Sequence, residues 1–124
     1  MNRSQAVEIM VCVRCRPADA PPDEPRAGLA FFEAVKDVAF ELDTNFTVRP
    51  IECMSACKRS CAVALQCAGK TTYLFGDLTP DVESAQQVVA CGQLYQASAD
   101  GLMPRAARPE RLREGILARL PAPG

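Results

Sequence analysis

The sequence predicts an α/β protein built on a mixed four-stranded sheet, with helices packed on the sheet and a short C-terminal helical tail. Three observations predict this class: an alternating apolar segment near the start, two long segments with apolar residues at helical spacing, and short apolar runs between turn residues. The chain has 124 residues, 48% hydrophobic and 23% charged, which suits one domain with a modest core.

The first half of the chain predicts a strand, a helix and a second strand. Residues 7–13 alternate between apolar and polar positions, and the proline-rich stretch 16–25 predicts a stiff loop. The helix is expected from just after this loop to about residue 42, because apolar residues recur there at helical spacing. The main stripe is Leu29, Phe32, Val35, Ala39 and Leu42. A second strand is expected over 46–53, at an edge of the sheet, because Pro50 lacks a backbone donor.

The second half predicts a β-hairpin followed by a helix. The apolar run 62–67 and the segment 70–75 are separated by an Ala-Gly turn, and Lys70 is interpreted as a residue of that turn. A long helix is expected to follow, running to about residue 98, with Thr79 as its cap and a proline at its first position.

The tail predicts one more short helix, over about 109–120, because Leu112, Ile116 and Leu120 recur on one side. Residues 102–124 carry five arginines against two glutamates. We interpret these arginines as a solvated helix face, with anion or partner binding as the alternative.

The predicted order is β-α-β-β-β-α, which is a thioredoxin-like layout. A strand, a crossover helix and a second strand form a parallel pair, and the hairpin adds two more strands to the sheet. We assign residues 1–101 to this domain and residues 102–124 to a basic tail packed on it or extending from it.

Composition excludes several function classes. The chain has no histidine, which excludes mixed cysteine–histidine zinc fingers, Rieske ligation and histidine-based catalysis. The net charge of −1 favours no nucleic-acid partner. No apolar run is long enough to span a membrane and no signal peptide is recognised, so we expect a cytoplasmic protein without membrane contact.

Two cysteine pairs, Cys12-x2-Cys15 and Cys53-x3-Cys57, carry most of the functional information. Each pair lies where a predicted strand ends, and in a parallel pair both strands end at the same edge of the sheet. Four thiolates in one place favour an iron–sulfur cluster or zinc. Cys61 is a possible substitute for Cys15 as a ligand. A thiol–disulfide enzyme is the third reading, although it leaves the second pair unexplained.

The motifs also carry a family resemblance. The segment Cys53-Met-Ser-Ala-Cys57 resembles the second half-site of the thioredoxin-like [2Fe–2S] ferredoxins and the [2Fe–2S] subunit of respiratory complex I. Nearly the whole chain resembles the DUF1636 family of bacterial predicted metal-binding proteins, through both cysteine segments, residues 69–78 and residues 108–121. The resemblance implies cluster ligands at Cys12, Cys15, Cys53 and Cys57, although the first ferredoxin spacing is longer than Cys-x2-Cys. It also suggests a link with cobalamin metabolism.

Together these observations predict a [2Fe–2S] ferredoxin-like electron carrier, not an enzyme, with a redox protein as partner. A four-cysteine zinc protein is the alternative, and a homodimer stays open. Cys67 and Cys91 are interpreted as core residues. Basic residues flank the proposed ligands and would offset the charge of a cluster or contact an acidic partner. They are Arg14, Arg16, Lys58 and Arg59.

Overall fold

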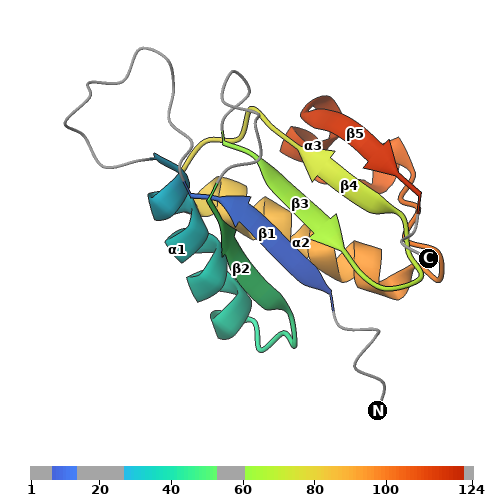
Figure 1. Cartoon of the computed structure of the whole chain (residues 1–124), viewed down its shortest axis with the longest axis horizontal. Helices are drawn as coiled ribbons and strands as arrows, with labels where there is room; N and C mark the ends of the chain where they lie inside the picture. Colours follow the sequence, from blue (N-terminus) through green and yellow to red (C-terminus); the bar gives the residue numbers. More distant parts are fainter. Residues whose placement is uncertain (1–6, 14–26, 53–60, 122–124) are drawn as a thin grey trace.

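A computed structural model of the chain describes residues 7–13, 27–52 and 61–121. Its centre is a five-stranded sheet in the order β2-β1-β3-β4-β5 (Figure 1). The strands are Glu8–Cys12 (β1), Thr47–Ile51 (β2), Val63–Gln66 (β3), Thr72–Phe75 (β4) and Ile116–Leu120 (β5). The helices are Ala27–Glu41 (α1), Val82–Ala97 (α2) and Glu110–Glu114 (α3), with a 3-10 turn at Arg105–Ala107 (η3). The predicted mixed α/β class is confirmed.

The strand pairing follows the predicted layout. β1 and β2 are parallel, whereas β1 with β3, β3 with β4 and β4 with β5 are antiparallel. β2 lies at the edge of the sheet, as Pro50 predicted, because a residue without an N–H group is tolerated where no further strand pairs.

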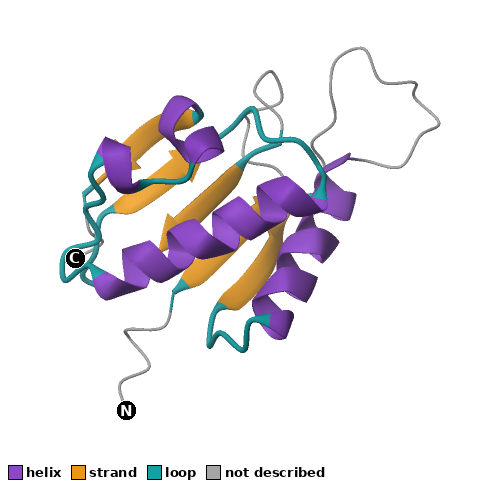
Figure 2. Cartoon of the chain, turned by 180° about the vertical axis from the view of Figure 1, so that it is seen from behind, coloured by secondary structure: helices purple, strands orange, loops and turns teal. Residues whose placement is uncertain are grey.

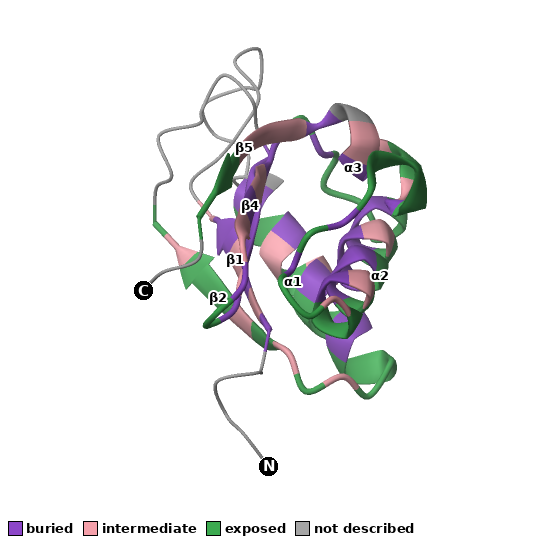
Figure 3. Cartoon of the chain, turned by 90° about the vertical axis from the view of Figure 1, so that its right-hand side faces the viewer, coloured by how far each residue is buried: buried purple, intermediate pink, exposed green. Residues whose placement is uncertain are grey.

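The two long helices lie side by side on one face of the sheet (Figures 2 and 3). Alternate strand residues point toward them, since successive side chains of a strand face opposite sides. The fully buried members of this core face include Ile9, Val11, Leu65, Tyr73 and Phe75. Residues between them, such as Met10 and Leu74, are only partly buried on the other face.

The apolar stripe predicted on α1 is right at its centre and wrong at its ends. Val35 and Ala39 are buried against the core, but Leu29 is 46% exposed and Leu42 is 52% exposed. The real buried face includes Phe31 and Val38, which the sequence placed at the margin of the stripe. The helix is therefore rotated from the predicted orientation, because packing against α2 as well as the sheet selects the buried residues.

The predicted cap of α2 is corrected by the structure. Asp81, rather than Thr79, is the N-cap residue, and its Oδ1 accepts a hydrogen bond from the Ser84 N–H at 2.8 Å. Thr79 donates its hydroxyl to Asp81 Oδ2 at 2.7 Å instead. An aspartate at this position satisfies an orphan backbone donor and places negative charge at the positive end of the helix.

Lys70 lies in the connection between β3 and β4, as predicted, but its side chain is buried. Only 8% of the residue is exposed, and its Nζ donates to the backbone carbonyls of Tyr95 at 3.1 Å and Gln96 at 2.8 Å. Nζ also lies 5.5 Å from the centre of the Tyr95 ring. The last carbonyls of a helix lack intrahelical donors, so Lys70 satisfies the end of α2 with a positive charge.

The predicted helix over 109–120 is wrong from residue 116 onward. α3 ends at Glu114, and the following residues form β5, which pairs with β4. Gly115 makes this possible, because its carbonyl accepts a bond from the Gly76 N–H at 2.7 Å and an added Cβ would lie only 2.5 Å from the Gly76 oxygen. The tail therefore adds a fifth strand to the predicted four, and the division at residue 101 stays a prediction.

Candidate metal centre

Cys12 stands at the end of β1, where the parallel pair of strands terminates. In the register of that pair Cys12 is the partner of Ile51, and the Val13 N–H donates to the Ile51 carbonyl at 2.9 Å. β1 and β2 thus end next to each other, at the edge of the sheet formed by their C-terminal ends, as predicted. Cys12 is buried, with 1% of the residue exposed.

The other three proposed ligands, Cys15, Cys53 and Cys57, lie outside the described residues. The chain positions next to them are nonetheless informative. Cys53 comes two residues after Ile51, the strand partner of Cys12, and Cys15 comes three residues after Cys12 itself. The last residues of β1 and β2, Cys12 and Ile51, lie together at one edge of the sheet, and we refer to this edge as the thiol edge.

Cys61 also lies at the thiol edge. The Cys12 N–H donates to the carbonyl of Ala62 at 3.2 Å, so the residue that follows Cys61, just before β3, lies beside Cys12. Burial raises the pKa of the Cys61 thiol to about 11, and the nearby Cys12 and Asp81 add to the increase. The predicted substitute ligand is therefore a neighbour of Cys12, whereas its role as a ligand stays a prediction.

The start of α2 is held beside Cys61 through the backbone. Cys61 and Leu78 exchange two hydrogen bonds, at 2.9 Å and 3.3 Å, and Asp81 caps the helix three residues later. The hydrogen bonds from the Ser84 N–H and the Thr79 hydroxyl keep the pKa of Asp81 below its usual value. The N-terminus of α2 thus lies near Cys61, and the Asp81 carboxylate that caps it adds to the raised pKa of the Cys61 thiol.

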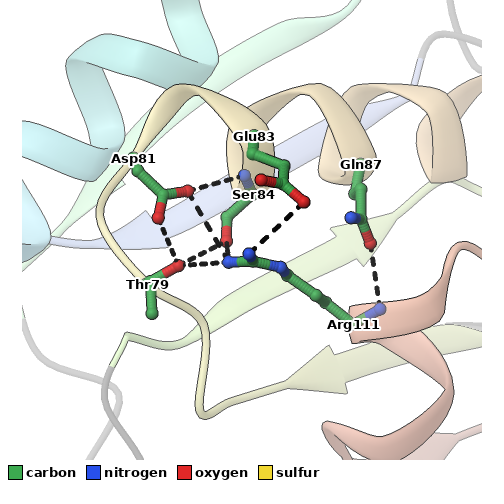
Figure 4. A network of polar contacts seen from close by, with 6 residues as sticks. All are labelled: Thr79, Asp81, Glu83, Ser84, Gln87 and Arg111. Atoms are coloured by element: carbon green, nitrogen blue, oxygen red, sulfur yellow. Dashed lines mark hydrogen bonds and ion pairs between the residues drawn. The ribbon is translucent and has the colours of Figure 1, made fainter.

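Arg111 links the tail to the start of α2 (Figure 4). Its Nη1 donates to the hydroxyls of Thr79 and Ser84, the latter at 2.6 Å. Its guanidinium also forms ion pairs with Asp81 at 3.7 Å and Glu83 at 3.4 Å. The sequence alone missed this network, because the partners lie about thirty residues apart.

The interpretation of the tail arginines as a solvated face is wrong for Arg108 and Arg111. Arg108 is only 6% exposed, and its carbonyl accepts a hydrogen bond from the Arg113 Nε at 2.8 Å. Arg111 is held by the network described above. The Arg111 side chain therefore connects the tail to α2, the Arg108 side chain is buried, and neither is free to form an open basic surface.

Cys67 and Cys91 are core residues, as predicted. Cys67 is 3% exposed at the opposite end of β3 from the thiol edge, and Cys91 is fully buried on α2. The Cys91 thiol lies 3.6 Å from the Met103 sulfur, and burial raises its pKa to about 12 although Arg108 opposes the shift. Such a protonated buried thiol is chemically inert.

The described part of the thiol edge fits a thiolate-bound metal centre. Within residues 7–13, 27–52 and 61–121, no group of three or more potential ligands is gathered in one place. Two thiols, Cys12 and Cys61, lie near each other there, and β1 and β2, which precede the remaining proposed ligands in the sequence, both end at this edge. The donors available are soft sulfurs without histidine, as iron–sulfur and four-cysteine zinc sites require.

None of the described helices is long and apolar enough to cross a membrane.

No curated protein matches the chain. Two solved structures resemble it over most of their length. One is a thioredoxin-like [2Fe–2S] ferredoxin from Aquifex aeolicus, 18% identical, with 92% of each chain covered and a TM-score of 0.59.

The other is a structure of the wild-type thioredoxin-like [2Fe–2S] ferredoxin from Aquifex aeolicus, 16% identical, covering 91% of this chain and 97% of that one, with a TM-score of 0.53. At these identities the likeness shows the fold, and the predicted thioredoxin-like layout is confirmed. A family model described as "Protein of unknown function (DUF1636)" matches residues 9–122. The match spans nearly the whole chain, and the chain therefore belongs to the DUF1636 family.

Proposed function

We propose that this protein binds one [2Fe–2S] cluster through Cys12, Cys15, Cys53 and Cys57 and carries single electrons. The observation that carries the proposal is the register of the parallel pair. Cys12 faces Ile51 across β1 and β2, so the second cysteine pair begins two residues beyond the strand position opposite the first. The Cys-x2-Cys and Cys-x3-Cys segments that begin at or just after the ends of these two strands would bring four thiolates within reach of a common centre without long connections.

Two further observations support a cluster held by sulfur ligands. The structures with the same fold are ferredoxins described as [2Fe–2S] proteins. The chain contains no histidine, so a centre built here relies on sulfur. A cluster held by four thiolates supplies reversible one-electron transfer, with a potential set by charge, hydrogen bonds and solvent exposure.

The protein's own residues would then position and insulate the centre. The buried Cys12 side chain keeps water from the inner side of the edge. The basic residues Arg14, Arg16, Lys58 and Arg59, which flank the proposed ligands in the sequence, would offset negative charge around them. The same cations would attract an acidic redox partner, and we expect no catalytic turnover by the isolated chain.

Anaerobic purification of the whole chain tests this proposal. We expect a red-brown protein with about two iron and two sulfide per chain and an EPR signal after reduction. A colourless protein with about one zinc per chain would instead establish the four-cysteine zinc alternative. A metal-free protein that reduces a test disulfide would establish the thiol–disulfide alternative.

Single Cys-to-Ser variants test the ligand assignment. We expect Cys12→Ser, Cys15→Ser, Cys53→Ser and Cys57→Ser to lose or destabilise the cluster. Cys91→Ser is the matched control, because that thiol is buried on α2 away from the thiol edge. If Cys15→Ser keeps full cluster content while Cys61→Ser loses it, Cys61 is the fourth ligand. A cytoplasmic location and a link with cobalamin metabolism stay predictions.

A further inference from the structure

The outward ridge of α1 carries an unusual set of exposed side chains. Phe40 is 85% exposed and Leu29 is 46% exposed, at opposite ends of the helix. Glu33 and Lys36 lie between them and are also exposed. These four residues follow each other at intervals of four, three and four positions, so they share one face of the helix. We call them the α1 ridge.

The α1 ridge is complementary to a reversed copy of itself. The point midway between Leu29 and Phe40 along the helix is also midway between Glu33 and Lys36. It lies between Ala34 and Val35. When two such helices pack antiparallel about a two-fold axis through that midpoint, each residue meets the one at the mirrored position. Leu29 then contacts Phe40 of the second copy, and Glu33 contacts Lys36 of the second copy. A two-fold interface requires this kind of self-complementarity.

The charges of the ridge are available for such contacts. None of the ion pairs formed among the described residues includes Glu33 or Lys36. Lys36 has its Nζ 6.0 Å from the centre of the Phe32 ring, which keeps its ammonium on the outside of the helix. In the antiparallel arrangement two Glu33–Lys36 pairs form by symmetry, and both carboxylates and both ammonium groups obtain a partner of opposite sign.

A hollow beside Phe40 offers space for an apolar side chain. It has a volume of about 410 Å³ and lies between α1 and β2, with Ala39, Phe46 and Val48 in its lining. In the antiparallel arrangement Leu29 of the second copy arrives next to Phe40, at the mouth of this hollow. The apolar ends of the ridge are thereby covered on both sides of the interface.

We propose that the protein forms a homodimer through antiparallel contact of the α1 ridge. One helix face buries less than the roughly 800 Å² per partner of a standard stable interface, so the dimer dissociates at low concentration. The inference is independent of the proposed cluster, because the four residues of the α1 ridge are exposed and none of them is a proposed ligand.

Sedimentation velocity of the whole chain from about 1 μM to about 1 mM tests the proposal. We expect a concentration-dependent shift from monomer to dimer. Glu33→Lys and Lys36→Glu each place like charges across both symmetric pairs, and each should raise the Kd about tenfold. The double variant Glu33→Lys/Lys36→Glu exchanges the signs and should restore dimer formation. Phe40→Ser should weaken it most.

Glu41→Lys is the matched control, since it makes the same charge change on an exposed residue of α1 outside the ridge. We expect its Kd to stay within about threefold of the parent. Circular dichroism confirms that each variant is folded. A chain that is monomeric up to 1 mM, a double variant that fails to recover, or a loss with Glu41→Lys equal to that with Glu33→Lys would each overturn the proposal. Iron content of the same samples reports separately on the proposed cluster.

Discussion

Replacing Lys70 with methionine tests how the hairpin holds the end of α2. The substitution keeps most of the aliphatic stem on the Tyr95 ring but removes the charge and both hydrogen bonds to the helix carbonyls. Because the side chain is buried, water does not replace these donors freely. We therefore expect Lys70→Met to destabilise the fold.

The magnitude follows from the contacts. Two hydrogen bonds from an ammonium contribute roughly 1.5 kcal/mol each, and the charge at the negative end of the helix adds about 0.5 kcal/mol. Burying the ammonium costs part of this gain, which methionine avoids. We expect a net loss of about 2 kcal/mol in the free energy of unfolding, which lowers the midpoint of urea unfolding by about 1 M and Tm by roughly 6 °C.

Urea unfolding followed by circular dichroism measures this loss. Lys36→Met is the matched control, because Lys36 is an exposed lysine on α1, and the effect should stay within about 0.5 kcal/mol. Both variants are measured at about 1 μM protein, where mass action keeps a weak dimer dissociated. If Lys70→Met loses no more than Lys36→Met, the buried ammonium does not stabilise the end of α2 and the reasoning is wrong.

Three further predictions rest on single contacts. Gly115→Ala should destabilise the fold by about 2 to 3 kcal/mol, because the added Cβ meets the Gly76 carbonyl oxygen at 2.5 Å. Gly92→Ala should cost less, because its Cβ meets the edge of the Phe46 ring at 2.9 Å. Equal unfolding midpoints for the two variants would contradict this. Asp81→Ala should cost about 1 kcal/mol at neutral pH. The pKa of Asp81 in the folded state is lowered from 3.8, so the stability that Asp81 contributes is present above pH 3.8 and disappears as the pH falls through the lower folded-state pKa. A stability difference between Asp81→Ala and the parent that persists in acid would refute the assignment. The Cys91 thiol, with its pKa raised to about 12, should resist iodoacetamide in the native protein at pH 8 and react after unfolding. Peptide mass mapping measures this labelling, and rapid labelling of the native protein would show that the thiol is not buried.

Most secondary structure could be predicted because it depends on residues close in sequence. The alternation in β1, the turn before Lys70 and the cap region of α2 all have local signals, and each element appeared within a few residues of its expected bounds. The tail was different. Leu112, Ile116 and Leu120 have helical spacing, yet the last two belong to β5, because pairing with the exposed edge of β4 outweighs a weak local preference.

The features of the candidate centre also separate into those that the sequence determines and those that depend on the tertiary structure. The absence of histidine, the two cysteine pairs and their positions after strands are properties of the sequence, and they limit a metal centre to sulfur chemistry. The strand–helix–strand order also predicted that β1 and β2 are parallel and end at one edge. That Cys61 lies beside Cys12, and that Arg111 and Lys70 hold the two ends of α2, were decided only by the tertiary structure. Local spacing determines which face or strand end a residue occupies, whereas contacts between residues far apart in the chain form only when the whole core packs.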